Sequence, residues 1–184
     1  VGPWTRFMNV LHDRSVPGDA DHNWSRFALR IPVAQPASVI FPLLSTRAGI
    51  ENWFLREAIF KTQDELERAA TEGIAPGDQY AWRWHGWPDS VQEFGVILEN
   101  NGSDTVSFTF AGNCTVTISL KETGALTVVE LTQENIPTDE SSRVRYYHGC
   151  STGWLFYLTN MKSLLEGGLD LRNRDEKLQG VLNA

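Results

Sequence analysis

The chain has 184 residues, enough for one domain with a substantial core. Its 16 lysines and arginines are scattered and outnumbered by 23 acidic residues, for a net charge of −7. This composition argues against a nucleic-acid partner, which would need a basic surface. No apolar run approaches the roughly 20 residues that span a bilayer. With no signal-peptide pattern at the N-terminus, we expect no membrane insertion and a cytoplasmic location.

Sequence motifs for catalysis and metal binding are missing. The two cysteines, Cys114 and Cys150, have neither CxxC nor Cys-His spacing, which predicts free thiols. We find no nucleophile elbow, phosphate loop or HExxH motif, so we expect no catalytic residue, no cofactor and no metal. Seven tryptophans and nine phenylalanines are a heavy aromatic load that needs another explanation.

The first part of the chain divides into an extension and the start of a domain. We expect residues 1–23 to form an N-terminal extension, 24–172 the domain and 173–184 a tail. Alternation of apolar residues predicts a strand over 27–33 with Phe27, Leu29, Ile31 and Val33 on one face. Pro36 opens a helical segment that Pro42 should kink or split. A second short helix should carry Trp53.

The middle of the chain predicts an antiparallel sheet. After a strand at 54–62, residues 62–78 are polar and compatible with a helix. The strands that follow are separated by the turn sequences WPD, NNGSD, AGN and ETG. Their expected inner faces hold, in order, Tyr80, Trp82 and Trp84; Phe94, Val96 and Leu98; Val106, Phe108 and Phe110; and Cys114, Val116, Ile118 and Leu120. The last strand, LTVVELTQ, has two apolar faces, so Glu130 is a buried acid if its face points inward.

A long terminal helix should cover this sheet. It is expected to span roughly 25 residues, from an N-cap at Thr138 or Asp139 to a C-cap at Gly167 and Gly168. On a helical wheel its apolar stripe contains Tyr147, Cys150, Trp154, Tyr157, Leu158, Met161 and Leu165. The opposite, polar face contains Arg145, Gly149, Phe156 and Asn160, and Phe156 is its one misplaced apolar residue. Gly149 and Gly153 form a notch on the helix flank where a ligand or another segment could approach closely.

Two segments resemble a known family. IPVAQPASVIFPLLSTRAGIENWF, residues 31–54, resembles the first strand and paired short helices of the START-related SRPBCC superfamily. GCSTGWLFYLTNMKSLLEGGLDLR, residues 149–172, resembles the terminal helix of bacterial homologues of the activator of the ninety-kilodalton heat-shock protein ATPase, with Gly153-Trp154 followed by Leu158, Lys162, Leu165, Glu166 and Gly168. The match covers about residues 25–172. It implies an α+β helix-grip fold, a curved antiparallel sheet of six or seven strands wrapped around the C-terminal helix.

The same resemblance implies either a cavity for a small hydrophobic molecule or, as in the eukaryotic co-chaperone, docking on a chaperone. If the chain binds a ligand, we expect a cavity between the sheet and the terminal helix. The alternative is that the same aromatic side chains form an ordinary packed core. The residues expected to line the cavity are Trp53, Tyr80, Trp82, Trp84, Phe94, Phe108, Phe110, Glu130, Trp154, Tyr157 and Met161.

Two other readings stay open. Phe156 could contact a protein partner or a second copy of the chain, or it could pack under the N-terminal extension. A lyase or cyclase that uses Glu130 or Glu93 is the least favoured reading, because only fold analogy supports it. His85 and His148 are expected to be exposed and separate.

Overall fold

The computed structural model describes residues 22–175 and 177–178, so nearly all of the expected N-terminal extension lies outside the described residues. The elements in chain order are β1 (Phe27–Val33), α2 (Ala37–Ser45), α3 (Arg47–Trp53), β2 (Glu57–Lys61), β3 (Gln79–Arg83), β4 (Gln92–Asn100), β5 (Thr105–Phe110), β6 (Cys114–Thr123), β7 (Leu126–Glu134), α4 (Glu140–Ser142), the π-helix η1 (Arg143–Gly149) and α5 (Cys150–Leu165). None of these helices is long and apolar enough to cross a bilayer.

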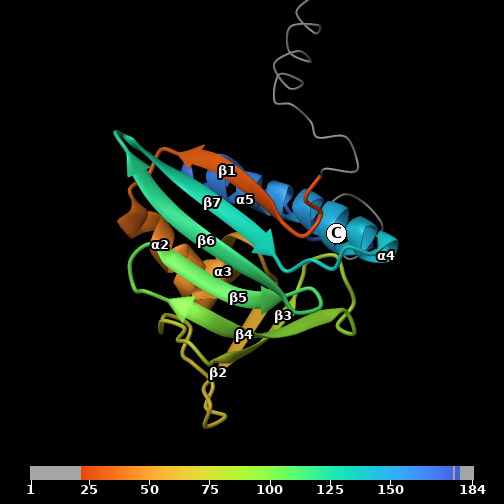
Figure 1. Ribbon diagram of the computed structural model, residues 1–184. Helices are drawn as coiled ribbons and strands as arrows, with labels where there is room; N and C mark the ends of the chain where they lie inside the picture. Colours follow the sequence, from red (N-terminus) through yellow and green to blue (C-terminus); the bar gives the residue numbers. More distant parts are fainter. Residues whose placement is uncertain (1–21, 176, 179–184) are drawn as a thin grey trace, which may run out of the picture.

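The strands form one curved antiparallel sheet in the order β1-β7-β6-β5-β4-β3-β2. The first strand therefore pairs with the last, and consecutive strands pair from β2 through to β7. The terminal helix α5 runs along one face of the sheet, and α2 and α3 cover another part of the same face (Figure 1). This arrangement confirms the predicted α+β helix-grip fold.

The terminal helix begins where the sequence predicts. The Asp139 side chain caps it by accepting a hydrogen bond from the backbone N–H of Ser142. Helical structure then continues without a break from Glu140 to Leu165. Near its end Gly167 has a φ of +81°, the left-handed conformation that favours glycine. What the sequence did not predict is the π-helix inside it, whose turns are wider than those of an α-helix.

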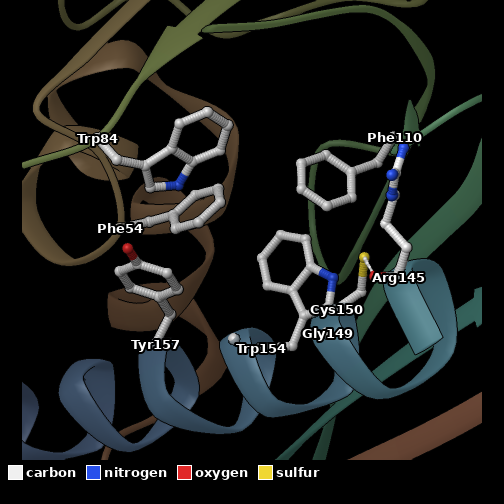
Figure 2. Close-up of a pocket in the computed structure, with 9 residues that line it drawn as sticks. Phe54, Trp84, Phe110, Arg145, Gly149, Cys150, Trp154 and Tyr157 are labelled. Atoms are coloured by element: carbon white, nitrogen blue, oxygen red, sulfur yellow. Dashed lines mark hydrogen bonds between the residues drawn. The ribbon is translucent and has the colours of Figure 1, made fainter. Parts of the chain in front are cut away.

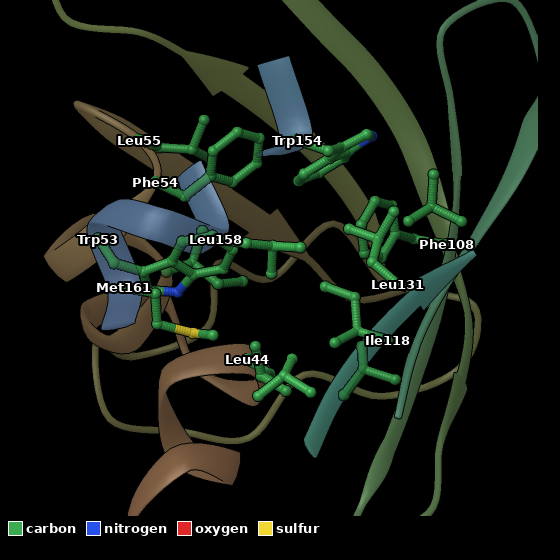
Figure 3. Close-up of a cluster of buried hydrophobic side chains, with 14 of the residues drawn as sticks. Leu44, Trp53, Phe54, Leu55, Phe108, Ile118, Leu131, Trp154, Leu158 and Met161 are labelled. Atoms are coloured by element: carbon green, nitrogen blue, oxygen red, sulfur yellow. The ribbon is translucent and has the colours of Figure 1, made fainter. Parts of the chain in front are cut away.

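The core lies between the sheet and the three main helices (Figure 3). Its largest fully buried side chains include Trp53, Trp82, Phe60, Leu131, Leu158 and Met161. The predicted inner faces of β1, β3, β5 and β6 are confirmed, since their apolar residues point into this core. The predicted stripe of the terminal helix is confirmed as well, with Trp154, Leu158 and Met161 buried.

The predicted inner face of β4 is wrong. Phe94 is 65% exposed, and Val96 and Leu98 lie on the same outer face. The reason is Gly95, which pairs with Tyr80 in the sheet. A Cβ added to Gly95 would lie 2.5 Å from the Tyr80 ring, so the glycine leaves room inside for that ring. Because side chains alternate along a strand, Phe94 must then face outward.

Glu130 is not a buried acid either. Its neighbours Val129 and Leu131 are fully buried on the inner face of β7, which turns Glu130 to the outer face. There it pairs with Arg30, which lies opposite it in the register between β1 and β7. Glu130 is therefore an ordinary ion-pair partner on the surface of the sheet, and it does not face the interior.

The polar insertion at residues 62–78 forms turns instead of a helix. It covers the free edge of β2, where the backbone N–H of Arg68 donates to the carbonyl oxygen of Phe60. The guanidinium of Arg68 pairs with the buried carboxylate of Asp78, and Glu72 adds a second ion pair. The insertion thus provides a hydrogen-bond donor to the free edge of β2, which could otherwise pair with a strand of another chain.

Candidate ligand-binding site

The space between the sheet and α5 is almost filled at its centre. A void of only about 10 Å³ remains there, enough for at most one water molecule. It is bounded by Leu44, Ile50, Trp53, Phe54, Trp82, Phe108, Ile118 and Trp154. The aromatic side chains expected at the centre of a cavity therefore form a packed core, and the centre of the fold has no room for a guest.

A larger hollow lies on the flank of the terminal helix (Figure 2). It has a volume of about 190 Å³, is partly open to solvent, and its accessible lining is mostly apolar. We call it the helix-flank pocket, and it is lined by Phe54, Trp84, Phe110, Arg145, Gly149, Cys150, Gly153, Trp154 and Tyr157. An apolar cavity of about 150 Å³ binds benzene. The pocket is therefore large enough for a guest built on one or two aromatic rings.

Two aromatic walls line this pocket and meet where the Phe54 ring lies 4.9 Å from the Trp154 ring (Figure 2). In one wall the Phe54 ring lies between Trp84 and Tyr157, with ring centroids 6.1 and 4.8 Å away. In the other wall Phe110 lies 5.1 Å from Trp154. Most of these contacts are tilted or edge-on, the arrangements that aromatic pairs prefer. The walls thus support each other while they leave ring faces available to a planar guest.

The terminal helix contributes the floor of the pocket. Gly149 and Gly153 both line it, and nothing lies within 4 Å of a Cβ added at Gly153. Arg145 and Gly149 belong to the π-helix, whose wider turns bring them beside Cys150 at the pocket. The notch predicted from the two glycines is therefore confirmed as part of a hollow.

Arg145 carries the pocket's only formal charge at neutral pH. Burial raises the pKa of the Cys150 thiol to about 11 and that of the Tyr157 hydroxyl to about 12, so both stay protonated. Arg145 is exposed and lies at the rim beside Phe110 (Figure 2). Among the described residues no hydrogen-bond partner is found for the Tyr157 hydroxyl. The pocket thus offers a guest an apolar body, one neutral hydroxyl and one cation.

The structure separates the predicted site residues into three groups. Trp84, Phe110, Trp154 and Tyr157 come together in the pocket. The second group belongs to the packed core and comprises Trp53, Tyr80, Trp82, Phe108 and Met161. Phe94 and Glu130 lie on the outer face of the sheet. The sequence reading missed Phe54 and placed Arg145 on the polar face of the helix.

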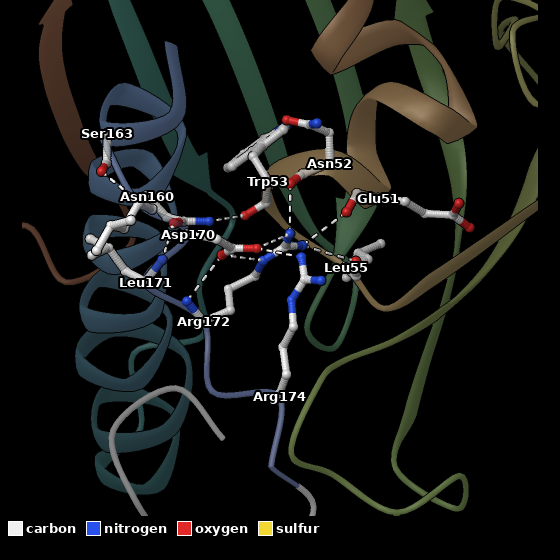
Figure 4. Close-up of polar contacts among 11 residues, drawn as sticks. Glu51, Asn52, Trp53, Leu55, Asn160, Ser163, Asp170, Leu171, Arg172 and Arg174 are labelled. Carbon is white, nitrogen blue, oxygen red and sulfur yellow. Dashed lines mark hydrogen bonds and ion pairs between the residues drawn. The ribbon is translucent and has the colours of Figure 1, made fainter. Parts of the chain in front are cut away.

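The segment after α5 caps the C-terminal end of α3 through Asp170 and Arg172, a contact that we call the clasp (Figure 4). The guanidinium of Arg172, only 2% exposed, donates to the carbonyl oxygens of Glu51, Asn52 and Leu55 at 2.6 to 3.1 Å. It also pairs with Asp170 at 2.7 Å, and its charge holds the pKa of that carboxyl well below the usual range. Arg172 therefore satisfies helix-end carbonyls that would otherwise be buried without donors.

Asn160 extends the clasp into the terminal helix. The sequence placed it on the polar face, yet it is fully buried. Its side-chain amide donates to the carbonyl oxygen of Trp53 at 2.8 Å and accepts the N–H of Leu171 at 2.7 Å. Asn160 thus holds Trp53 while Arg172 holds Leu55, and because these residues lie on either side of Phe54, the two side chains position one wall of the pocket.

Neither histidine of interest reaches the pocket. Burial and the nearby charges of Arg172 and Arg174 lower the pKa of His85, and His148 is exposed on the π-helix. The carboxylate of Glu93 is half-buried and accepts the N–H of Ala111 at 2.7 Å. In the part of the chain that the structure describes, no cluster of three or more His, Cys, Asp or Glu residues could hold a metal.

Comparison with known proteins gives a family match and a set of similar folds. The sequence model of the family described as "Activator of Hsp90 ATPase homolog 1-like protein" matches residues 34–166. This range contains β2 to β7, both short helices and α5. A search of the curated proteins finds no match.

Solved structures similar to this chain share its architecture. A protein from Staphylococcus saprophyticus has 20% identity and a TM-score of 0.61, covering 80% of this chain and 96% of its own. The Aha1 dimer from Colwellia psychrerythraea has 18% identity and a TM-score of 0.60, with coverages of 78% and 97%. CalU16 from Micromonospora echinospora has 17% identity and a TM-score of 0.57, with coverages of 79% and 77%. At these identities the likeness concerns the fold alone.

Proposed function

The chain belongs to the family of activator of Hsp90 ATPase homolog 1-like proteins, and we propose that it binds a small hydrophobic molecule in the helix-flank pocket. Members of this family and its superfamily generally bind ligands or are similar to Aha1. The observation that carries the proposal is the contrast between two spaces in one domain. The centre is packed to about 10 Å³, while an apolar hollow of about 190 Å³ persists on the helix flank.

The preservation of that hollow has an energetic cost. Closely packed interiors leave few voids larger than a water molecule, and unfilled apolar space loses dispersion contacts. Side chains at Gly149 and Gly153 could fill the space, and glycine inside a helix is itself unfavourable by roughly 0.5–1 kcal/mol. The lost dispersion contacts and the unfavourable glycines occur at the same place, which supports a function for the empty volume. A guest would restore the missing contacts.

The test is a thermal-shift screen of one-ring and two-ring aromatic compounds. A compound present at 100 times its Kd should stabilise the protein by about 2.7 kcal/mol, which corresponds to roughly 5–10 °C in Tm for a domain of this size. Binding should also quench tryptophan fluorescence, since Trp84 and Trp154 line the pocket. If no compound in a broad set raises the Tm or quenches fluorescence, the proposal fails.

Self-association is a second candidate function, favoured by a different observation. Phe94, Val96 and Leu98 form an exposed apolar row on the outer face of β4, on the opposite side of the sheet from the pocket. Contiguous apolar patches of this kind mark contact surfaces. The similar protein from Colwellia psychrerythraea is described as a dimer. By contrast Phe156, for which such a contact was one of two expected roles, is half-buried against Tyr157.

Light scattering with size-exclusion chromatography tests this second candidate. The wild type should elute as a dimer at micromolar concentrations, and Phe94→Ser should shift it to the monomer. Phe156→Ser is the matched control, expected to leave the mass unchanged. A monomeric wild type, or a Phe94→Ser variant that remains dimeric, would remove β4 as the contact surface. Residues 4–11 of the N-terminal extension, under which Phe156 could instead pack, lie outside the described residues.

A further inference from the structure

We infer that the guest of the helix-flank pocket is an aromatic anion, a one-ring or two-ring compound whose carboxylate or sulfonate is held by Arg145. The inference deepens the proposed function, because it names the chemical class of ligand for the same pocket. Two independent features of the described residues carry it. One is the bonding state of Arg145, and the other is the distribution of polar groups around the pocket.

Arg145 differs from the other arginines in the described part of the chain. Eight of them form ion pairs with carboxylates. Arg143 donates to the carbonyl oxygen of Thr138 at 2.8 Å and lies over the Trp24 ring. Arg145 alone has neither an ion pair nor a side-chain hydrogen bond in this part of the chain. Five donors in a planar fork are therefore available to an outside acceptor.

The pocket favours an anion over a cation at that position. Among its nine lining residues there is no acid, and the Cys150 thiol and Tyr157 hydroxyl are neutral at physiological pH. Glu93 on β4 does not line the pocket, and its carboxylate accepts the N–H of Ala111. A guanidinium binds carboxylates and sulfonates through two parallel hydrogen bonds, which also fixes the orientation of the guest.

Arg145 and the aromatic side chains of the pocket lie where the anionic group and the rings of such a guest would bind. Figure 2 shows Arg145 at the rim next to Phe110, while the wall of Phe54, Trp84 and Tyr157 lies across the hollow. Because Phe54 and Trp154 already lie 4.9 Å apart, a planar guest with its anionic group at the rim would lay its rings along these aromatic side chains and not between those two. The charge would remain partly hydrated, so it avoids the desolvation cost of a fully buried ion.

The experiment compares two isosteric probes, 2-naphthoate and 2-naphthamide, by isothermal titration calorimetry at low ionic strength. The wild type should bind the anion roughly tenfold more tightly than the amide, as expected for a charge-assisted hydrogen bond at a partly exposed site. Arg145→Gln should bring the ratio of the two Kd values close to one, and Arg145→Lys should restore part of it. Salt should weaken binding of the naphthoate much more than binding of the naphthamide.

Arg143→Gln is the matched control. It removes the same charge from the same π-helix, but its side chain does not line the pocket. It should leave the ratio of Kd values unchanged. Equal binding of both probes by the wild type, or a ratio unaffected by Arg145→Gln, overturns the anion inference while the pocket itself survives. Failure of both probes to bind the wild type contradicts the proposed function and the inference together.

Discussion

A side chain that fills the helix-flank pocket from its floor should abolish ligand binding without impairing folding. The change is Gly153→Leu, with Gly153→Ala as the smaller step. Nothing lies within 4 Å of a Cβ at this position, so neither side chain meets a steric barrier at its first atom. Four added carbon atoms, each the size of a water molecule of about 30 Å³, occupy about 120 Å³. That leaves less than half of the 190 Å³ hollow, too little for an aromatic ring.

Both variants should be more stable than the wild type. Replacing glycine inside α5 gains about 1 kcal/mol of helix propensity. Leucine adds about 1 kcal/mol more, because its side chain is partly buried against Phe54 and Tyr157, and full burial contributes about 1.5–3 kcal/mol. The Tm should therefore rise by about 2–4 °C for alanine and by about 4–8 °C for leucine.

The assay measures Tm without ligand and the Kd of the tightest aromatic probe from the screen. Gly153→Ala should still bind it, whereas Gly153→Leu should not bind it at attainable concentrations. Thr152→Leu, an exposed neighbour on the same helix, is the control for nonspecific effects of an added leucine. Wild-type affinity in Gly153→Leu would show that the guest binds elsewhere. A destabilised Gly153→Ala would show that the notch is filled in solution.

Three further outcomes follow from the contacts described. Arg172→Gln removes the donor to three buried carbonyls and the partner of Asp170, so chemical denaturation should show a loss of about 3 kcal/mol. Alkylation of Cys150 by iodoacetamide at pH 8, read by mass spectrometry, should be roughly 200-fold slower than that of an unperturbed thiol, since its pKa of about 11 leaves little thiolate. The lowered pKa of His85 means that the unfolded chain takes up a proton first. Stability should therefore fall as the pH decreases from about 6.5 toward the folded-state pKa, and His85→Gln should flatten this dependence in denaturation curves measured across that window.

Much of the fold could be predicted because its signals are local. Alternation gave the inner face of β1, turn sequences marked the hairpins, and Asp139 and Gly167 marked the ends of the helix. The faces of β4 and β7 could not be read in this way. Gly95 has no side chain to indicate which face is buried, and its partner Tyr80 comes from another strand. In β7 both faces are apolar, so pairing with β1 and β6 decides which one is inside.

The pocket escaped full prediction for a related reason. An α-helical wheel places Arg145 and Gly149 opposite the buried stripe, but the π-helix changes the angle between successive residues. Both residues consequently face the hollow together with Cys150. A helix of regular α-helical pitch would turn Arg145 toward solvent, and a side chain at Gly153 would occupy the floor. The π-helix and the glycine therefore act on the same space, one by supplying a cation at its rim and the other by keeping it open.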